Sequence, residues 1–414
     1  MTLADQIRRG EVSRRDAIEA AIAKIPPGAV VAERYAEALA EPPVDGPFSG
    51  VPTFVKDLSH VKGMPIAWGT KCSTISKRDD PFVKTLRRLG FVILGKSATP
   101  ELGLTATTEP EGRPPARNPF DAERTTGGSS GGAGALVGGG VVPIAHGSDG
   151  GGSIRIPASL CGCVGRKVSR GIADMPGSKL LPINIAVDGV LTATIDDTLA
   201  FWHALGIERA EPRALRIGWW DRSPVAVVAV DPATTAAVHA TVDACRALGH
   251  AVDAIAPPMT EAQLDDFLTY WPFVTWLQIK TARLMMHRGF DRSKLDWWTT
   301  GLLEHFAFGA TWRAMRRLRA FAKTYRALPY DILLSPVTTE PAPKLGFLGP
   351  PYEHAFAALK GFASFTAMQN VVGAPAISIP VASSASGLPI GVQLAGKRGD
   401  DATVLALASA LTSR

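Results

Sequence analysis

The chain has 414 residues, of which 46% are hydrophobic and 20% are charged, with 41 glycines and 32 prolines. This composition is typical of a loop-rich folded protein with a sizeable core, and it excludes a disordered chain. The net charge of +6 is small for this length and the lysines and arginines are scattered, which argues against a nucleic-acid-binding protein.

The N-terminal residues 1–25 alternate charged and apolar side chains at helical spacing. We predict an amphipathic helix here, interrupted near Gly10 and restarted by a cap at Ser13. The pattern is neither a signal peptide nor a membrane anchor. Every apolar run that approaches the ~18 residues of a membrane helix is interrupted by Gly or Pro, so we expect a cytoplasmic protein without a membrane span.

Short apolar runs then alternate with helical patterns. A helical pattern at 82–90 precedes the run at 91–97, and another at 231–249 lies between the runs at 214–220 and 250–256. This alternation predicts an α/β fold in which a mixed central β-sheet is flanked by helices on both faces, an α/β/α sandwich.

Residues 260–328 have a different pattern, with long helical stretches and many aromatic residues. We interpret them as a helical insertion in a single domain, 1–414, whose core comprises about 48–259 and 329–414. Near the C-terminus, 375–396 holds two strand patterns joined by a Ser/Gly turn, which predicts a hairpin.

The most unusual segment is 125–157, which is rich in glycine, serine and threonine. A P-loop would need a lysine, and none occurs between Lys96 and Lys167. A dinucleotide fingerprint fails because Val137 stands where the third glycine belongs. Residues 127–131 match GxSxG, but a polar, Pro-rich loop precedes them instead of the strand that a nucleophile elbow requires.

The same segment presents two serines, Ser129 and Ser153, separated by enough chain for a helix and a strand to bring their hydroxyls together. Glycines at 150–152 allow successive N–H groups to converge on an oxyanion. A serine nucleophile needs a base. Lys56 follows a strand-like run, where partial burial would lower its pKa; His60 and His146 are the nearest histidines and remain alternatives.

Five segments together resemble the amidase signature family of Ser-Ser-Lys hydrolases, in order and over nearly the whole chain. They are "GVPTFVKD", "RNPFDAERTTGGSSGGAGALV", "PIAHGSDGGGSIRIPASLCGCVGRKVSRG", "YDILLSPVTTEPAP" and "GLPIGVQLAG". The resemblance implies the family's fold and a hydrolase that cleaves amide bonds, and also ester or carbamate bonds, through an acyl-serine.

The resemblance also implies the role of each site residue. It makes Ser153 the nucleophile, Lys56 the base, and Ser129, which in the family follows a cis peptide bond, the bridge between them. The oxyanion hole would consist of the N–H groups of Gly150, Gly151, Gly152 and Ser153. The residues that would stabilise this arrangement without contacting the substrate are Asp149, Arg155 and Ser130.

The sequence departs from the family pattern at three places. Gly150 stands where many members carry Thr or Ile, Thr126 replaces a common Pro, and "GRKVSRG" replaces "GLKPT-G". These changes concern the rigidity of the loops and leave the three catalytic positions filled.

The chemistry implied by the resemblance requires no metal and no organic cofactor. The expected partner is a small-molecule amide, ester or carbamate, and the chain is expected to be a monomer or homodimer. We expect the aromatic insertion to contribute a hydrophobic or aryl-binding pocket, with the following candidates: Trp271, Trp276, Trp297, Trp298 and Phe306. Packing of these rings in the core is the alternative.

Two other functions compete with a free-standing amidase. An A subunit of the glutamyl-tRNA amidotransferase complex shares the triad, but it would need partner subunits and a polar glutamine pocket. A binding protein that has lost activity is disfavoured because no catalytic position is substituted.

Overall fold

The computed structural model describes residues 2–286 and 289–412. The chain begins with two short helices, α1 (Leu3–Arg8) and α2 (Arg14–Ala23). The Ser13 side chain accepts a hydrogen bond from the backbone N–H of Asp16 and so caps α2. The predicted break in the N-terminal helix is therefore confirmed.

An eight-stranded mixed sheet forms the centre of the molecule, in the order β10-β9-β11-β13-β12-β7-β8-β6. Strands β10, β9 and β11 are parallel, and the remaining neighbours are antiparallel. The predicted hairpin is present as β12 and β13. The strands are β6 (Ile144–Asp149), β7 (Val164–Lys167), β8 (Val187–Thr192), β9 (Arg216–Trp219), β10 (Ala251–Ala254), β11 (Ile332–Pro336), β12 (Ala376–Ser383) and β13 (Pro389–Ala395).

A second sheet, in the order β1-β5-β2, lies at the β6 edge of the first. The hydroxyl of Thr53 on β2 donates to the carbonyl of Ile144 on β6 at 2.9 Å, and the backbone N–H of Lys56 donates to His146 Nδ1 at 3.2 Å. Side chains thus join the two sheets. The strands are β1 (Val30–Glu33), β2 (Pro52–Lys56) and β5 (Val92–Ser97), and a separate small ribbon consists of β3 (Pro65–Ile66) and β4 (Thr74–Ile75).

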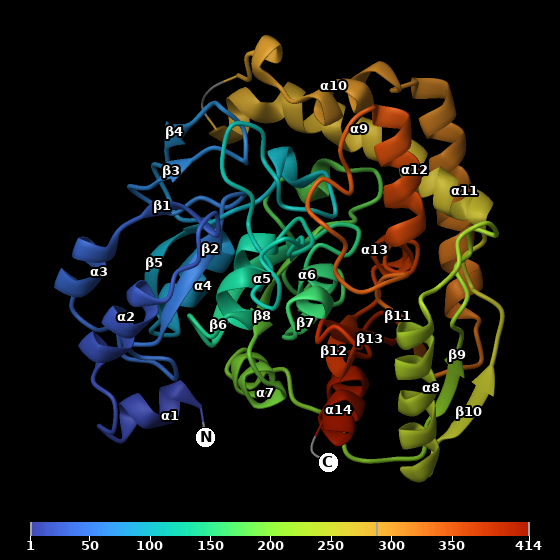
Figure 1. Cartoon of the computed structure of the whole chain (residues 1–414), viewed down its shortest axis with the longest axis horizontal. Helices are drawn as coiled ribbons and strands as arrows, with labels where there is room; N and C mark the ends of the chain where they lie inside the picture. Colours follow the sequence, from blue (N-terminus) through green and yellow to red (C-terminus); the bar gives the residue numbers. More distant parts are fainter. Residues whose placement is uncertain (1, 287–288, 413–414) are drawn as a thin grey trace.

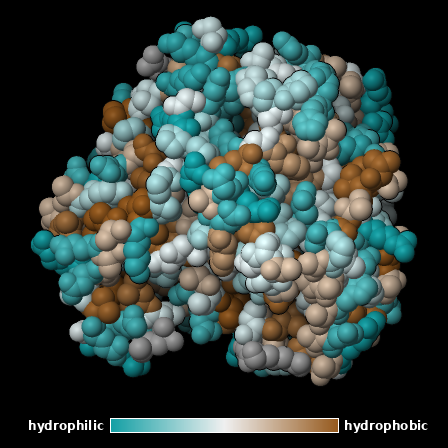
Figure 2. All heavy atoms as spheres, viewed as in Figure 1, coloured by the Kyte–Doolittle hydropathy of each residue, from teal (hydrophilic) through white to brown (hydrophobic). Residues whose placement is uncertain are grey.

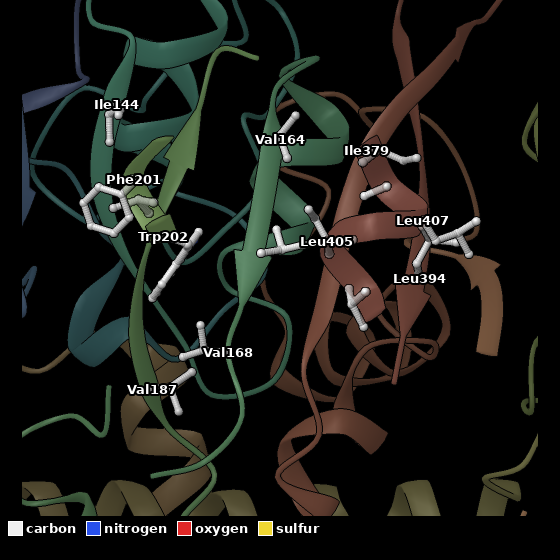
Figure 3. Packing of buried hydrophobic residues seen from close by; sticks show 14 of the residues in the cluster. Ile144, Val164, Val168, Val187, Phe201, Trp202, Ile379, Leu394, Leu405 and Leu407 are labelled. Atoms are coloured by element: carbon white, nitrogen blue, oxygen red, sulfur yellow. The ribbon is translucent and has the colours of Figure 1, made fainter. Parts of the chain in front are cut away.

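Helices cover both faces of the central sheet, as the α/β/α prediction requires (Figure 1). Ile144 belongs to the cluster that packs under α7 and α14 (Figure 3), whereas its neighbour Ala145 packs with α5 on the other face. The helices outside 260–328 that follow α2 are α3 (Tyr35–Ala40), α4 (Pro81–Arg88), α5 (Gly131–Gly138), α6 (Arg155–Leu160), α7 (Ile195–His203), α8 (Pro232–Ala247), α12 (Tyr352–Phe362), α13 (Ala367–Val372) and α14 (Asp401–Thr412).

The described part of 260–328 is helical and lies across the top of the molecule in Figure 1. Its elements are α9 (Glu261–Met286), α10 (Trp297–Glu304) and α11 (Phe308–Arg326), with a short 3-10 helix η3 (Arg292–Lys294); two others are η1 (Glu101–Gly103) and η2 (Ser178–Leu180). The face in Figure 2 mixes hydrophilic residues with separate hydrophobic patches. No helix within the described residues has the length and apolar character needed to cross a membrane.

Candidate active site

The ends of four chain segments meet at the junction of the two sheets. Lys56 is the last residue of β2, and Ser148 lies near the end of the adjacent β6. Ser129 immediately precedes Ser130, the cap residue of α5, and Ser153 lies in the loop between β6 and α6. The strand pairing and the two glycine-rich loops therefore bring together residues that are far apart in the sequence.

Lys56 is completely buried, and its ammonium nitrogen is surrounded by serine oxygens. Nζ lies 2.8 Å from Ser129 Oγ, 2.9 Å from Ser130 Oγ and 3.0 Å from Ser148 Oγ. Burial lowers the pKa of Lys56 to about 7, although the negative charges of Asp149 and Asp188 act in the opposite direction. At neutral pH a large fraction of Lys56 is an uncharged amine.

The hydrogen bonds around Lys56 determine which serine can donate to it. The Ser130 hydroxyl donates its one proton to the carbonyl of Ser148 at 3.2 Å, so towards Lys56 it acts as an acceptor. A neutral amine has two protons and one lone pair. If one proton goes to Ser130 Oγ and the other to an oxygen of Ser148, the lone pair can accept the hydroxyl of Ser129, 2.8 Å away.

Ser129 and Ser153 line one cavity of about 1030 Å³, a volume that includes its opening to solvent. The two serine loops are tied together because the backbone N–H of Ser130 donates to the carbonyl of Ser153 at 3.1 Å. The peptide bond between Gly128 and Ser129 is cis, as the family resemblance predicts. The Ser129 hydroxyl therefore contacts Lys56 and borders the cavity that Ser153 also lines.

The loop that carries Ser153 is held by a buried ion pair. Asp149 and Arg155 are fully buried, with Arg155 Nη2 2.9 Å from Asp149 Oδ1. Burial by itself would raise the pKa of Asp149, but the adjacent guanidinium and its hydrogen bonds hold the pKa below its usual value. Asp149 also accepts the N–H groups of Gly152 at 2.8 Å and Ile154 at 3.2 Å.

Those contacts change the prediction for the oxyanion hole. The N–H of Gly152 points to Asp149, so this N–H is not available to an oxyanion, and the expected donors are reduced to Gly150, Gly151 and Ser153. Gly152 itself has a φ of 129°, and a Cβ there would collide with Thr366 Oγ1. Position 152 therefore requires glycine because of its backbone conformation, and the N–H of Gly152 holds the loop through its hydrogen bond to Asp149.

Sequence reasoning missed the residues that complete this support. Gln369 Oε1 and Gln393 Oε1 accept from Arg155 Nη1 at 3.1 and 2.5 Å, and Asn370 Nδ2 donates to Asp149 Oδ1 at 2.9 Å. Gln369 and Asn370 form a polar pair inside the otherwise apolar α13. That pair could have identified Gln369 and Asn370, and Gln393 is likewise a polar residue within the otherwise apolar strand β13.

We expect Arg155→Met to lower the free energy of unfolding by about 3–5 kcal/mol, because it leaves the Asp149 carboxylate buried without its cation. Urea denaturation followed by circular dichroism measures this effect. The matched control is Asp149→Asn/Arg155→Met, which buries no lone charge and should regain part of the loss. If the free energy of unfolding of Arg155→Met were within 1 kcal/mol of the wild-type value, the Asp149–Arg155 ion pair would contribute little to stability.

Of the two histidine alternatives, His146 does not have the geometry of a base for Ser153. His146 is fully buried; its Nδ1 accepts the N–H of Lys56, and its Nε2 lies 3.1 Å from Asp188 Oδ1. Both ring nitrogens are therefore engaged in joining β2, β6 and β8. His60 lines the cavity, with its Nδ1 3.1 Å from Ser76 Oγ.

Of the five aromatic candidates, the structure brings only Trp271 to the cavities beside Ser153. Its Nε1 donates to the carbonyl of Leu104 at 3.2 Å, and its ring lies near Gly150. Trp276 and Phe306 pack against each other with Phe273 and Phe308. Trp297 and Trp298 contact each other, and Trp298 packs against Tyr352 and Phe356. These four rings fill helix interfaces instead, because aromatic composition does not reveal which helix face meets the cavity.

Comparison with known proteins places the site in context. The family model described as Amidase matches residues 13–405. A protein of Mycobacterium leprae (strain TN) named "Putative amidase AmiC" is 38% identical, over 98% of this chain and 92% of its own length. The 6-aminohexanoate-cyclic-dimer hydrolase of Paenarthrobacter ureafaciens is 32% identical, over 99% and 93%.

A solved structure of 6-aminohexanoate cyclic dimer hydrolase in complex with substrate superimposes with a TM-score of 0.87 at 29% identity, covering 99% of this chain and 95% of that one. By its sequence and its fold, the chain belongs to the amidase signature family of hydrolases.

Proposed function

We propose that this chain hydrolyses amide bonds of hydrophobic small molecules through an acyl-enzyme on Ser153. The observation that carries the proposal is the contact between Lys56 Nζ and Ser129 Oγ, 2.8 Å, at a cavity that Ser153 also lines. A lysine whose pKa is about 7 can act as a general base near neutral pH.

In the first half of the reaction, the Ser153 hydroxyl attacks the substrate carbonyl carbon. Its proton passes to Ser129 Oγ while the Ser129 proton passes to Lys56 Nζ, which becomes an ammonium. The N–H groups of Gly150, Gly151 and Ser153 stabilise the negative charge that develops on the carbonyl oxygen. The proton then returns from Lys56 through Ser129 to the leaving nitrogen, which departs as a neutral amine.

In the second half, water attacks the acyl group on Ser153 and gives up a proton along the same path. The carboxylic acid is released and Ser153 regains its hydrogen. Esters and aryl carbamates fit the same steps, since their carbonyl oxygens would occupy the same donors and their leaving groups are no worse than an amine.

The walls of the cavity support a hydrophobic substrate. Apolar side chains from four segments line it, namely Leu58, Leu104, Leu181, Ile185, Trp271, Val274 and Leu277. Each ring-sized group buried there contributes roughly 1.5–3 kcal/mol of binding free energy. These walls favour a free-standing amidase over an amidotransferase A-type subunit, which would have to bind the polar side chain of glutamine.

A substrate panel tests this proposal. We expect kcat/KM for an acyl anilide to exceed that for acetamide by at least about a hundredfold, because two or more apolar groups become buried, with measurable turnover of an aryl carbamate. Trp271→Leu should reduce the anilide preference. Trp276→Leu is the control, since Trp276 packs away from the cavity. Faster turnover of acetamide than of the anilide would exclude the hydrophobic site.

A further inference from the structure

Ser153 lies where two cavities meet. The second cavity has a volume of about 500 Å³ with its opening to solvent, compared with about 1030 Å³ for the first. We call them the smaller and the larger cavity. Both are bordered by Ser153, Gly103, Leu104 and Trp271. The Trp271 Nε1–H donates to the carbonyl of Leu104 at 3.2 Å, which fixes the indole ring at the junction of the two cavities.

The glycine loop before Ser153 also faces both cavities. Gly150 lines the larger cavity and Gly151 the smaller one. A Cβ on Gly150 would lie 3.6 Å from the Trp271 ring, and a Cβ on Gly151 would lie 3.2 Å from the ring of Phe267. A substrate carbonyl held by the N–H groups of this loop is therefore at the junction. Its two substituents can extend into different cavities.

The position of Ser129 distinguishes the two cavities. Ser129 is among the described residues that line the larger cavity, whereas its neighbour Gly128 borders the smaller one. In the proposed reaction the leaving nitrogen takes its proton from Ser129, and this transfer needs a hydrogen-bond distance of about 2.6–3.2 Å. The nitrogen must therefore face the larger cavity, and so must the substituent that it carries.

The smaller cavity is compact and mainly apolar. Among the described residues that line it, Lys360 is the one charged side chain. Lys360 Nζ lies 2.8 Å from Glu261 Oε1 and 2.6 Å from Asp265 Oδ1, so its charge is already paired. Most of the wall consists of hydrocarbon side chains from α6, α9 and α12, namely Ile156, Leu264, Phe267, Leu268 and Leu359. These surroundings suit a small uncharged apolar group.

We propose that the amine half of the substrate occupies the larger cavity and the acyl half the smaller one, so that preferred substrates combine a compact apolar acyl group with a larger amine. This inference rests on the proposed amide hydrolysis and adds to it the orientation of the substrate. It makes the residues of the smaller cavity the determinants of acyl size. After acylation the amine leaves the larger cavity, and water takes its place beside Ser129 while the acyl group stays in the smaller cavity.

Two series of anilides test the orientation. In the first series the amine is aniline and the linear acyl group grows from acetyl to decanoyl. In the second series the acyl group is the best one of the first, and the amine grows from aniline to 4-hexylaniline. We expect kcat/KM to gain up to about fourfold per buried methylene in either series. The gain should end at fewer carbon atoms in the acyl half than in the amine half, because the smaller cavity is filled first.

A matched pair of alanine-to-leucine variants assigns each half to its cavity. Ala363 lines the smaller cavity and Ala186 the larger one, and both are partly buried. Ala363→Leu should lower kcat/KM at least about tenfold for the acyl group that the wild type prefers and move the preference to a shorter chain, because added methylenes crowd the cavity. It should leave the ratio of kcat/KM between the 4-hexylanilide and the anilide unchanged.

Ala186→Leu should have the opposite pattern. We expect it to lower the ratio between the 4-hexylanilide and the anilide at least about tenfold and to keep the order of the acyl groups. Leu268→Ala provides a second test of the smaller cavity, because it enlarges that cavity and should move the preferred acyl group to a longer chain. This variant keeps the inference testable if a leucine variant does not fold.

The outcomes separate the two proposals. A change in the amine ratio by Ala363→Leu together with a change in the acyl order by Ala186→Leu would overturn the inference and leave amide hydrolysis standing. Equal effects of both variants on both series, or no effect, would overturn it as well, because the cavities would then not separate the two halves. Failure of the wild type to cleave any anilide would refute the proposed function itself. Calorimetry of both series with the two leucine variants would then still decide which half each cavity binds.

Discussion

The Ser153→Ala variant is expected to cleave the best amide substrate at least about a thousandfold more slowly than the wild type. The substitution removes the nucleophile and with it the covalent route. It leaves the backbone N–H groups of Gly150, Gly151 and position 153 in place, so we expect some residual catalysis by the proposed oxyanion hole. Steady-state kinetics measures the loss, and mass spectrometry of the wild type during ester turnover should show an acyl adduct that the variant lacks.

Ser159→Ala is the matched control for this substitution. Ser159 lies on α6, six residues after Ser153, and its hydroxyl accepts the backbone N–H of Gly391 at 3.0 Å. Removing it costs about 1–3 kcal/mol of stability because that N–H becomes unpaired, but the rate should stay near that of the wild type. A Ser153→Ala rate above one tenth of the wild-type rate on every substrate would rule out Ser153 as the nucleophile.

Much of the fold could be predicted because local patterns determine it. The alternation of apolar runs and helical stretches predicted the mixed sheet with helices on both faces, and the Ser/Gly turn predicted the pairing of β12 with β13. The division into two hydrogen-bonded sheets could not be predicted. It depends on Thr53 and His146, whose side chains take the place of backbone pairing between β2 and β6.

The candidate site shows a similar division between local and distant information. The two serine loops are continuous in sequence, so their motif pointed to Ser129, Ser153 and the Asp149–Arg155 pair. The groups that hold Arg155 come from more than 200 residues away: Gln369 lies in none of the segments that carry the resemblance, and Gln393 lies in "GLPIGVQLAG" without any local sign of this contact. Which aromatic ring reaches the cavity depends on how α9 is rotated against its neighbours, and composition contains no information on that rotation.

The pH dependence of the reaction should report the titration of Lys56. Because the neutral amine is the base, kcat/KM should rise about tenfold per pH unit below the pKa of about 7 and level off above it. Lys56→Met should lower kcat/KM at pH 8 by at least about a thousandfold and remove this rise. The variant should fold. In the unfolded chain the Lys56 amine stays protonated up to its ordinary pKa, so folding at neutral pH must remove that proton, which lowers the free energy of unfolding. Methionine has no such penalty.

A second buried lysine provides the control for that experiment. Burial also lowers the pKa of Lys167 to about 7, and the positive charge of Arg155 adds to the effect. However, Lys167 Nζ donates to the carbonyls of Val168 and Ala374 at 3.0 and 2.7 Å and has no contact with the serines. Lys167→Met removes the donor to two buried carbonyls and also removes the cost of burying a neutral lysine, and it should keep the midpoint near pH 7. If the midpoint moved in Lys167→Met, or in His146→Gln, while Lys56→Met retained the rise, Lys56 would not be the base.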